Sequence, residues 1–392
     1  MMKDRNIRIA YLLAAMKNSW FWLGIWIFYY LRFTNYAGIG LIETILIITL
    51  TLMEIPTGAI ADLLGKKKTL ILAFLFELIG GLMMAMAPNF SVLAGSVFVM
   101  CIGGALYSGT LEALVYDSLK QEGNQKKYDR VISKINSIGL LTPAICGAVG
   151  GFLYLIEPKL PFYANAAGYG IGLFLSFWLT EPVIDTEKFT LSNFIRQTRQ
   201  GLLQLTRSTD IKKQTIMLLS IGFFVVIVDE MLNSFLGFEF GFGAKQLGML
   251  TAVIYLISAA AAQLTPWIRH KFGDNYSNFV VGGLIAISLI ISPIIGIIVG
   301  GITLAFRSSL QAIFGSMASV TINNNSESKY RATTISTFNM IKNIPYVLSA
   351  FFLGSLADQI SARWLAAGLG AALLIMLVPQ FLWRKVYVSS RK

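Results

Sequence analysis

Residues 58–68 read Gly58-Ala-Ile-Ala-Asp62-Leu-Leu-Gly65-Lys66-Lys67-Lys68 and join two long apolar segments, 38–61 and 69–87. Each segment is close to the ~20 residues that cross a bilayer as a helix. The three lysines place the turn on the side of the membrane where positive charge collects. The sequence therefore predicts a membrane protein with this turn between its second and third spans.

The composition of the whole chain extends this interpretation. Of 392 residues, 55% are hydrophobic and only 13% are charged, with a mean hydropathy of +0.66, whereas soluble domains carry roughly 25% charged residues. We expect an all-α membrane protein with twelve transmembrane helices. The expected spans are 11–32, 38–61, 69–87, 90–119, 131–155, 162–180, 214–236, 245–268, 277–292, 294–320, 332–356 and 362–383.

The distribution of positive charge predicts the orientation. Most of the 32 lysines and arginines fall in the loops that share a face with the two termini. The opposite face carries only Arg32, Lys159, Lys245 and Arg363. Both termini are therefore expected in the cytoplasm, with the chain crossing the cell membrane many times. Nucleic acid is not an expected partner, because the charges flank spans and do not form one patch.

The chain also repeats itself. Leu111-Glu112-Ala113-Leu114 corresponds to Leu310-Gln311-Ala312-Ile313 at equivalent points of two six-span halves. We expect an N-terminal bundle at 1–180, a cytoplasmic linker at 181–213 and a C-terminal bundle at 214–392. In the linker, Ser192 is the expected cap of an amphipathic helix, 193–205, that lies on the lipid bilayer surface.

The 58–68 turn resembles the corresponding loop of the major facilitator superfamily, which reads Gly-x-x-x-Asp-basic-x-Gly-basic-basic. Gly58, Asp62, Gly65, Lys66 and Lys67 match it, whereas Leu63 replaces a basic residue. The resemblance implies a fold of two pseudo-symmetric six-helix bundles. It also implies that this turn is a gating latch, with Asp62 at the N-terminus of the eleventh span and with Asp117 and Arg130 as partners. Gly58 permits close helix approach and Gly65 a tight turn.

Several ionisable residues lie inside the expected spans, where a charge is costly unless it is paired or hydrated. Asp229 and Glu230 fall near the middle of span seven, Arg307 in span ten and Lys342 in span eleven. Glu54, Glu77 and Glu112 lie in spans two, three and four. Arg32 and Glu43 are expected to flank the outer turn between spans one and two.

In the superfamily that this chain resembles, spans one, four, seven and ten line a central cavity. The resemblance implies proton coupling by Asp229 or Glu230, with Glu112 as a second carboxylate, because no histidine lies within a span. It implies a substrate site built from these residues: Arg307, Lys342, Asn233, Gln311, Trp26, Tyr29 and Tyr30. Plain packing of the aromatics and a structural buried ion pair for the charges remain open alternatives.

Span five contains Gly139-x-x-x-Pro143-x-x-x-Gly147-x-x-Gly150-Gly151, which resembles the Gly/Pro motif of drug–proton antiporters with changed spacing. This favours proton-coupled export of amphipathic small molecules. The alternatives are a proton-coupled importer of an anionic or sugar-like solute, a lipid translocase, and a scaffold or membrane enzyme. We expect no enzyme activity, cofactor or metal site, because no nucleophile–base, phosphate-loop or metal-ligand spacing is present. The resemblance implies a monomer.

Overall fold

The computed structural model describes residues 5–182, 191–327 and 330–389, without the side chains of 54–63, 191, 193–194, 274–275, 332 and 381–389. The described chain is helical and contains no strand, which confirms the predicted all-α class. Within these described ranges, ten helices are long and apolar enough to cross a membrane. The two other expected spans are α8 (Leu160–Ser176), which is shorter, and the first span, which is broken.

The chain divides into two compact units. The first contains 1–34, 45–194 and 243–252, and the second contains 35–44, 195–242 and 253–392. Three helices thus contribute to both units: α3 (Tyr36–Leu64) begins in the second, whereas α9 (Leu191–Thr206) and α12 (Ala244–Ala262) begin in the first. The bundles expected at 1–180 and 214–392 and the linker at 181–213 stay a prediction.

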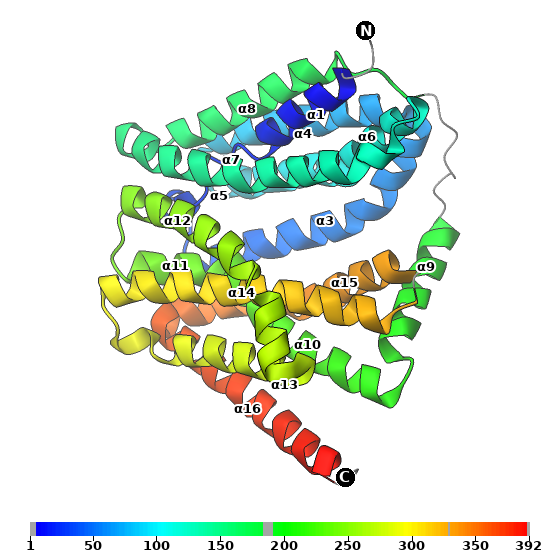
Figure 1. Cartoon of the computed structure of the whole chain (residues 1–392). Helices are drawn as coiled ribbons and strands as arrows, with labels where there is room; N and C mark the ends of the chain where they lie inside the picture. The colour runs from blue at the N-terminus through cyan, green and yellow to red at the C-terminus, as the bar shows by residue number, and fades with distance from the viewer. Residues whose placement is uncertain (1–4, 183–190, 328–329, 390–392) are drawn as a thin grey trace. The chain divides into compact units, whose positions relative to one another are not determined.

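The first unit is organised around α4 (Lys66–Ala85), which packs against α5 (Phe90–Tyr107) and α8. Its remaining helices are α1 (Arg5–Lys17), α2 (Trp26–Tyr30), α6 (Thr110–Gln121) and α7 (Tyr128–Ile156). Leu13, Phe74 and Leu114 are fully buried in the apolar core. Helices α1 and α8 lie side by side in this unit (Figure 1).

The second unit contains α9 (Leu191–Thr206), α10 (Thr209–Ile227), the π-helical turn η2 (Val228–Leu232) and α11 (Asn233–Glu239). It continues with α13 (Thr265–Ile290), α14 (Ile297–Asn325), α15 (Arg331–Ile360) and α16 (Ala362–Ser389). Helix α13 packs against α14 and α16, and α10 packs against α15. Helix α9 begins at Leu191, so Ser192 lies inside the helix and is not its cap, contrary to the prediction.

Two glycines show the internal repeat directly. Gly65 precedes α4 with φ 87° and ψ 156°, and Gly273 interrupts α13 with φ 74° and ψ 154°. Both backbones need a positive φ that glycine adopts without a steric penalty. The polar residues around His270, which fall between the expected spans 245–268 and 277–292, lie in the helix that precedes this break. The two halves therefore use the same turn before their third spans.

Candidate functional site

The seventh span changes from α10 to the π-helical turn η2 at the position of its two acids. Asp229 and Glu230 both lie in this turn, and their side chains are exposed. The other three residues of the turn are buried: Val228, Met231 and Leu232. Single π turns inside α-helices are rare and occur frequently at functional sites. The sequence identified the two acids, but nothing in its periodicity indicated the turn that presents them.

Lys342 of α15 is a cation that acts on this turn. Its ammonium interacts electrostatically with both Asp229 and Glu230. The aliphatic part of the lysine lies over Gly222 of α10, where an added Cβ would be 2.9 Å from Lys342 Cγ. Gly222, which the sequence analysis did not select, therefore provides the space that allows Lys342 to reach the acids.

Glu43 is a third carboxylate of this cluster. It lies within α3 and is 6% exposed, so the expectation that it flanks an outer turn is wrong. The Tyr346 hydroxyl donates a hydrogen bond to Glu43 Oε2 over 3.4 Å. Glu43 also interacts electrostatically with Glu230. Only the tertiary packing of α3 on α15 brings it there. We call Asp229, Glu230, Lys342 and Glu43 the second-unit cluster.

Arg307 of α14 is completely buried. Its guanidinium donates to Asn233 Oδ1 at 3.1 Å, to Ser288 Oγ at 3.3 Å and to the Ser288 carbonyl at 3.5 Å. Within the described residues it has no carboxylate within ion-pair distance. Arg307 is therefore held by neutral groups, and Ser288 is a partner that the sequence analysis missed.

Asn233 and Gln311 belong to the same hydrogen-bond network. The Asn233 amide donates to Gln311 Oε1 and to Ser308 Oγ, each over 3.4 Å. The Gln311 amide donates to the Val225 carbonyl at 3.2 Å. The structure thus joins Arg307, Asn233 and Gln311 in one network, and their role in a substrate site stays a prediction.

The aromatic side chains expected in the substrate site are packing residues in this conformation. Trp26, Tyr29 and Tyr30 are 8%, 0% and 8% exposed. The Tyr29 hydroxyl donates to the Met84 carbonyl at 2.8 Å, and its ring lies 4.1 Å from that of Phe162. These contacts agree with the alternative in which the three aromatic side chains serve packing.

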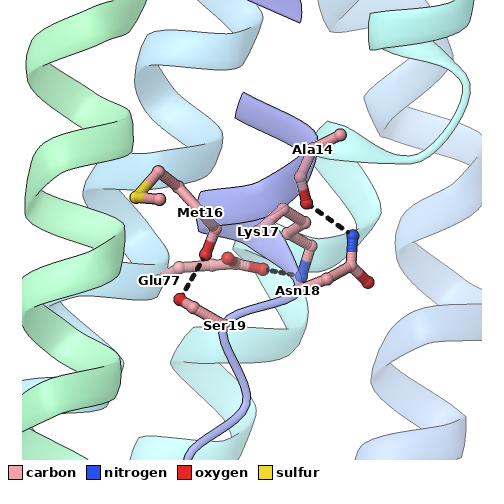
Figure 2. A network of polar contacts seen from close by, with 6 residues as sticks. All are labelled: Ala14, Met16, Lys17, Asn18, Ser19 and Glu77. Carbon is pink, nitrogen blue, oxygen red and sulfur yellow. Dashed lines mark hydrogen bonds and ion pairs between the residues drawn. The ribbon is translucent and has the colours of Figure 1, made fainter. Parts of the chain in front are cut away.

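A second polar cluster lies in the first unit, where the first span is broken. Figure 2 shows Lys17 at the end of α1 beside Glu77 of α4, with which it forms an ion pair. The Asn18 and Ser19 side chains donate to the carbonyls of Ala14 and Met16 and so satisfy the end of α1. Sequence reasoning noted Glu77 but missed Lys17, although a lysine inside an apolar segment was a visible signal.

Glu112, near the start of α6, belongs to the same unit. Its Oε2 is buried and has no hydrogen-bond partner among the described residues. Glu112 and Glu77 both interact electrostatically with the Tyr107 hydroxyl. The carboxylate expected to carry a proton therefore lies near Tyr107 in the first unit, whereas Asp229 and Glu230 belong to the second.

The latch residues are only partly described, because Gly58 and Asp62 fall within 54–63, where the structure does not describe side chains. Lys66 Nζ forms an ion pair with Asp117 at 2.5 Å. The backbone amides of Lys66 and Lys67 both donate to the Glu181 carboxylate at 2.7 Å. Arg130 is exposed. Glu181 thus caps α4, which the sequence analysis missed because it placed this residue at the start of the linker.

The glycines of α7 allow the backbones of two neighbouring segments to approach this helix closely. A Cβ on Gly150 would overlap the Phe21 carbonyl oxygen, and one on Gly151 would lie 3.0 Å from Lys245 Cα. Phe21 belongs to the non-helical segment of the first span. In this structure the Gly/Pro motif therefore accommodates the break in the first span and the start of α12.

The part of the chain that the structure describes contains no candidate metal site, that is, no group of three histidine, cysteine, aspartate or glutamate residues that could hold a metal ion.

Comparison with known proteins agrees with this architecture. The sequence model of the Major Facilitator Superfamily matches residues 8–349. The uncharacterized MFS-type transporter YxaM of Bacillus subtilis (strain 168) is 23% identical over 64% of this chain and 63% of its own length. The quinolone resistance protein NorA of Staphylococcus aureus (strain MRSA252) is 28% identical over 38% of this chain and 36% of its length. The chain thus spans less than two thirds of these relatives.

Solved structures extend the likeness to nearly the whole chain. The nucleoside transporter NupG superposes with a TM-score of 0.76 at 16% identity, over 97% of this chain and 99% of its own. A D-xylose–proton symporter superposes with a TM-score of 0.72 at 13% identity, over 96% and 97%. Identities this low establish the fold that the proteins share.

Proposed function

Because the chain belongs to the major facilitator superfamily, we propose that this multi-pass membrane transporter exports amphipathic small molecules in exchange for protons. The observation that carries the proposal is the second-unit cluster, in which Asp229 and Glu230 are exposed on a π turn beside Lys342. In a purely structural buried ion pair, the carboxylates would be buried, whereas Asp229 and Glu230 are exposed. Exposed carboxylates within a transmembrane helix can exchange protons.

The charges of the cluster suggest how a proton is coupled. With all four groups ionised, the three carboxylates of Asp229, Glu230 and Glu43 and the ammonium of Lys342 leave a net charge of −2, and two bound protons make the cluster neutral. Enclosing a neutral cluster in a low-dielectric environment costs much less than enclosing a net charge. The protonated transporter can therefore change its open side without cargo, whereas the deprotonated transporter requires a cationic or dipolar cargo to do so.

Alternating access also needs contacts that form on one side and break on the other. We assign Gly58, Asp62, Gly65, Lys66 and Lys67 to an inner latch, supported by the Lys66–Asp117 ion pair. Both termini are assigned to the cytoplasm and the chain to the cell membrane, on the basis of its basic loops. A phosphatase that is active only after export from the cytoplasm should be inactive when it is fused to either terminus, if this orientation is correct.

Cellular accumulation of ethidium tests the proposal. Expression should lower accumulation, and a protonophore should abolish the effect. Asp229→Asn and Glu230→Gln, made separately, should each reduce the proton-dependent part of export by at least about tenfold. Glu122→Gln, at the end of α6 and outside both clusters, is the matched control. Proton-driven export that is unchanged in both variants would refute the coupling role.

Import is the second candidate. A raffinose permease of Escherichia coli is 23% identical over 59% of this chain and 56% of its own length, and the symporter with the shared fold carries D-xylose with protons. Under import, Arg307 and Lys342 would bind an anionic or sugar-like solute. Substrate-dependent alkalinisation of the medium by expressing cells, with no change in ethidium accumulation, would favour import over export.

A further inference from the structure

Two interrupted helices meet in the first unit. Helix α1 ends at Lys17 and the chain is non-helical until α2, while α5 ends at Tyr107 and Gly109, at φ 73°, precedes α6. The Lys17 ammonium lies 5.6 Å from the centre of the Tyr107 ring, so the two ends are adjacent. Non-helical backbone at membrane depth persists only where protein buries it or where it lines a hydrated space, and broken helices in transporters form binding sites.

The Lys17 ammonium occupies surroundings suited to an organic cation. It pairs with Glu77 Oε1, and the rings of Tyr107 and Tyr169 lie 5.6 and 5.9 Å away. A carboxylate provides charge-assisted hydrogen bonding, and aromatic faces attract a cation through the ring quadrupole. Gly103 makes room for this arrangement, because a Cβ there would be 2.5 Å from Glu77 Cγ.

The cluster has more hydrogen-bond acceptors than donors. Glu77 is 2% exposed, and its Oε2 has no hydrogen-bond partner within the described residues. Glu112 Oε2 in α6 and Asn165 Oδ1 in α8, which belong to the same unit, also have no hydrogen-bond partner among the described residues. Buried acceptors without donors are costly. Two carboxylates with one ammonium repel an anion, and a quaternary ammonium offers no N–H group to the unpaired oxygens.

We propose that this cluster binds a protonated primary or secondary amine of the transported molecule, and that Lys17 occupies the amine position when the site is empty. The proposal rests on the proposed transport of small molecules and specifies their chemistry. The Lys17 side chain is 16% exposed and Glu77 2%, so the lysine is the partner that can withdraw. An incoming ammonium replaces that of Lys17 on Glu77 and donates its remaining N–H groups to the unpaired oxygens.

Thermal unfolding of the purified full-length protein tests the site without transport. The probes are phenethylamine and its neutral analogue phenethyl alcohol, titrated against wild type and Lys17→Met. Removing the resident ammonium should increase the apparent affinity for phenethylamine by about tenfold, because the competing group is gone. Phenethyl alcohol should not stabilise either protein. Lys245→Met is the matched control, since Lys245 lies over the Phe152 ring at 4.5 Å without a described carboxylate partner.

Adding Glu77→Gln to Lys17→Met should abolish the gain in affinity. If Lys17→Met alone does not fold, wild type is compared with this double variant, in which no buried charge is left unpaired, and phenethylamine must stabilise wild type more. Equal stabilisation of all variants, or of none, overturns the amine site. That outcome is independent of proton-driven ethidium export and its loss in the Asp229 and Glu230 variants, which test the proposed function.

Discussion

The Asp358 carboxylate near the end of α15 accepts hydrogen bonds from the backbone amides of Tyr36 at 3.0 Å and Ala37 at 2.9 Å, at the start of α3. These amides lie at a helix N-terminus, where they have no acceptor within the helix and where the helix dipole favours an anion. The two helices also touch closely: a Cβ on Gly40 or Gly354 would overlap backbone of the opposite helix. Hydrogen bonds and close backbone contact thus hold this end of α3 on α15.

Asp358→Asn should weaken this fastening. Loss of the charge at the helix N-terminus is expected to cost about 1 kcal/mol of stability. Labelling of a cysteine placed at Ala37 by a membrane-impermeant maleimide should become faster. Glu239→Gln is the control, because Glu239 caps α16 in the same way through the Ala362 amide at 2.7 Å. Equal labelling rates in the two variants would show that Asp358 has no special role in holding α3.

Gly150→Ala should destabilise the protein severely. The new methyl group would overlap the Phe21 carbonyl oxygen, and a backbone atom cannot move aside as a flexible side chain can. We expect a loss of more than about 2 kcal/mol, the range of serious overpacking. The comparison is Gly139→Ala in the same helix, where the nearest atom is Asn18 Nδ2 at 3.7 Å. Similar melting temperatures for the two variants would contradict the close contact.

Gly222→Ala should impair proton coupling while preserving the fold. Its methyl group would push the Lys342 stem, now 2.9 Å from the expected Cβ, away from Asp229 and Glu230. Proton-dependent export should fall several-fold, and Lys342→Met should reproduce the effect. Gly283→Ala, which faces open space, serves as the control. Full coupling in Gly222→Ala would remove Lys342 from the mechanism.

Arg307→Met should separate stability from function. A fully buried guanidinium held by neutral Asn233 and Ser288 retains much of the cost of burying a charge. The variant is therefore expected to melt no lower than wild type, and to lose transport if Arg307 contributes to the substrate site. Arg307→Lys keeps the charge but loses the fork geometry, so it should melt lower. A large loss of stability in Arg307→Met would instead identify a structural arginine.

The predicted fold followed from properties that a linear sequence contains. Apolar length, basic loops and the 58–68 turn determined the helical class, the family and most span positions, because membrane insertion acts on contiguous segments. The break after Lys17 was not predicted, although Asn18, Ser19 and Gly24 interrupt the apolar run there. Its backbone is accommodated by glycines of α7, more than a hundred positions further along the chain.

The acids of span seven were also visible in the sequence, because a charge in an apolar run stands out whatever surrounds it. Their π turn, the approach of Lys342 over Gly222, the burial of Glu43 against Tyr346, and the pairing of Lys17 with Glu77 were decided by tertiary structure alone. The last three of these features join helices that are distant in the chain. The physical reason is that hydropathy depends on a residue and its neighbours in sequence, whereas the partner of a buried charge depends on which helices pack together.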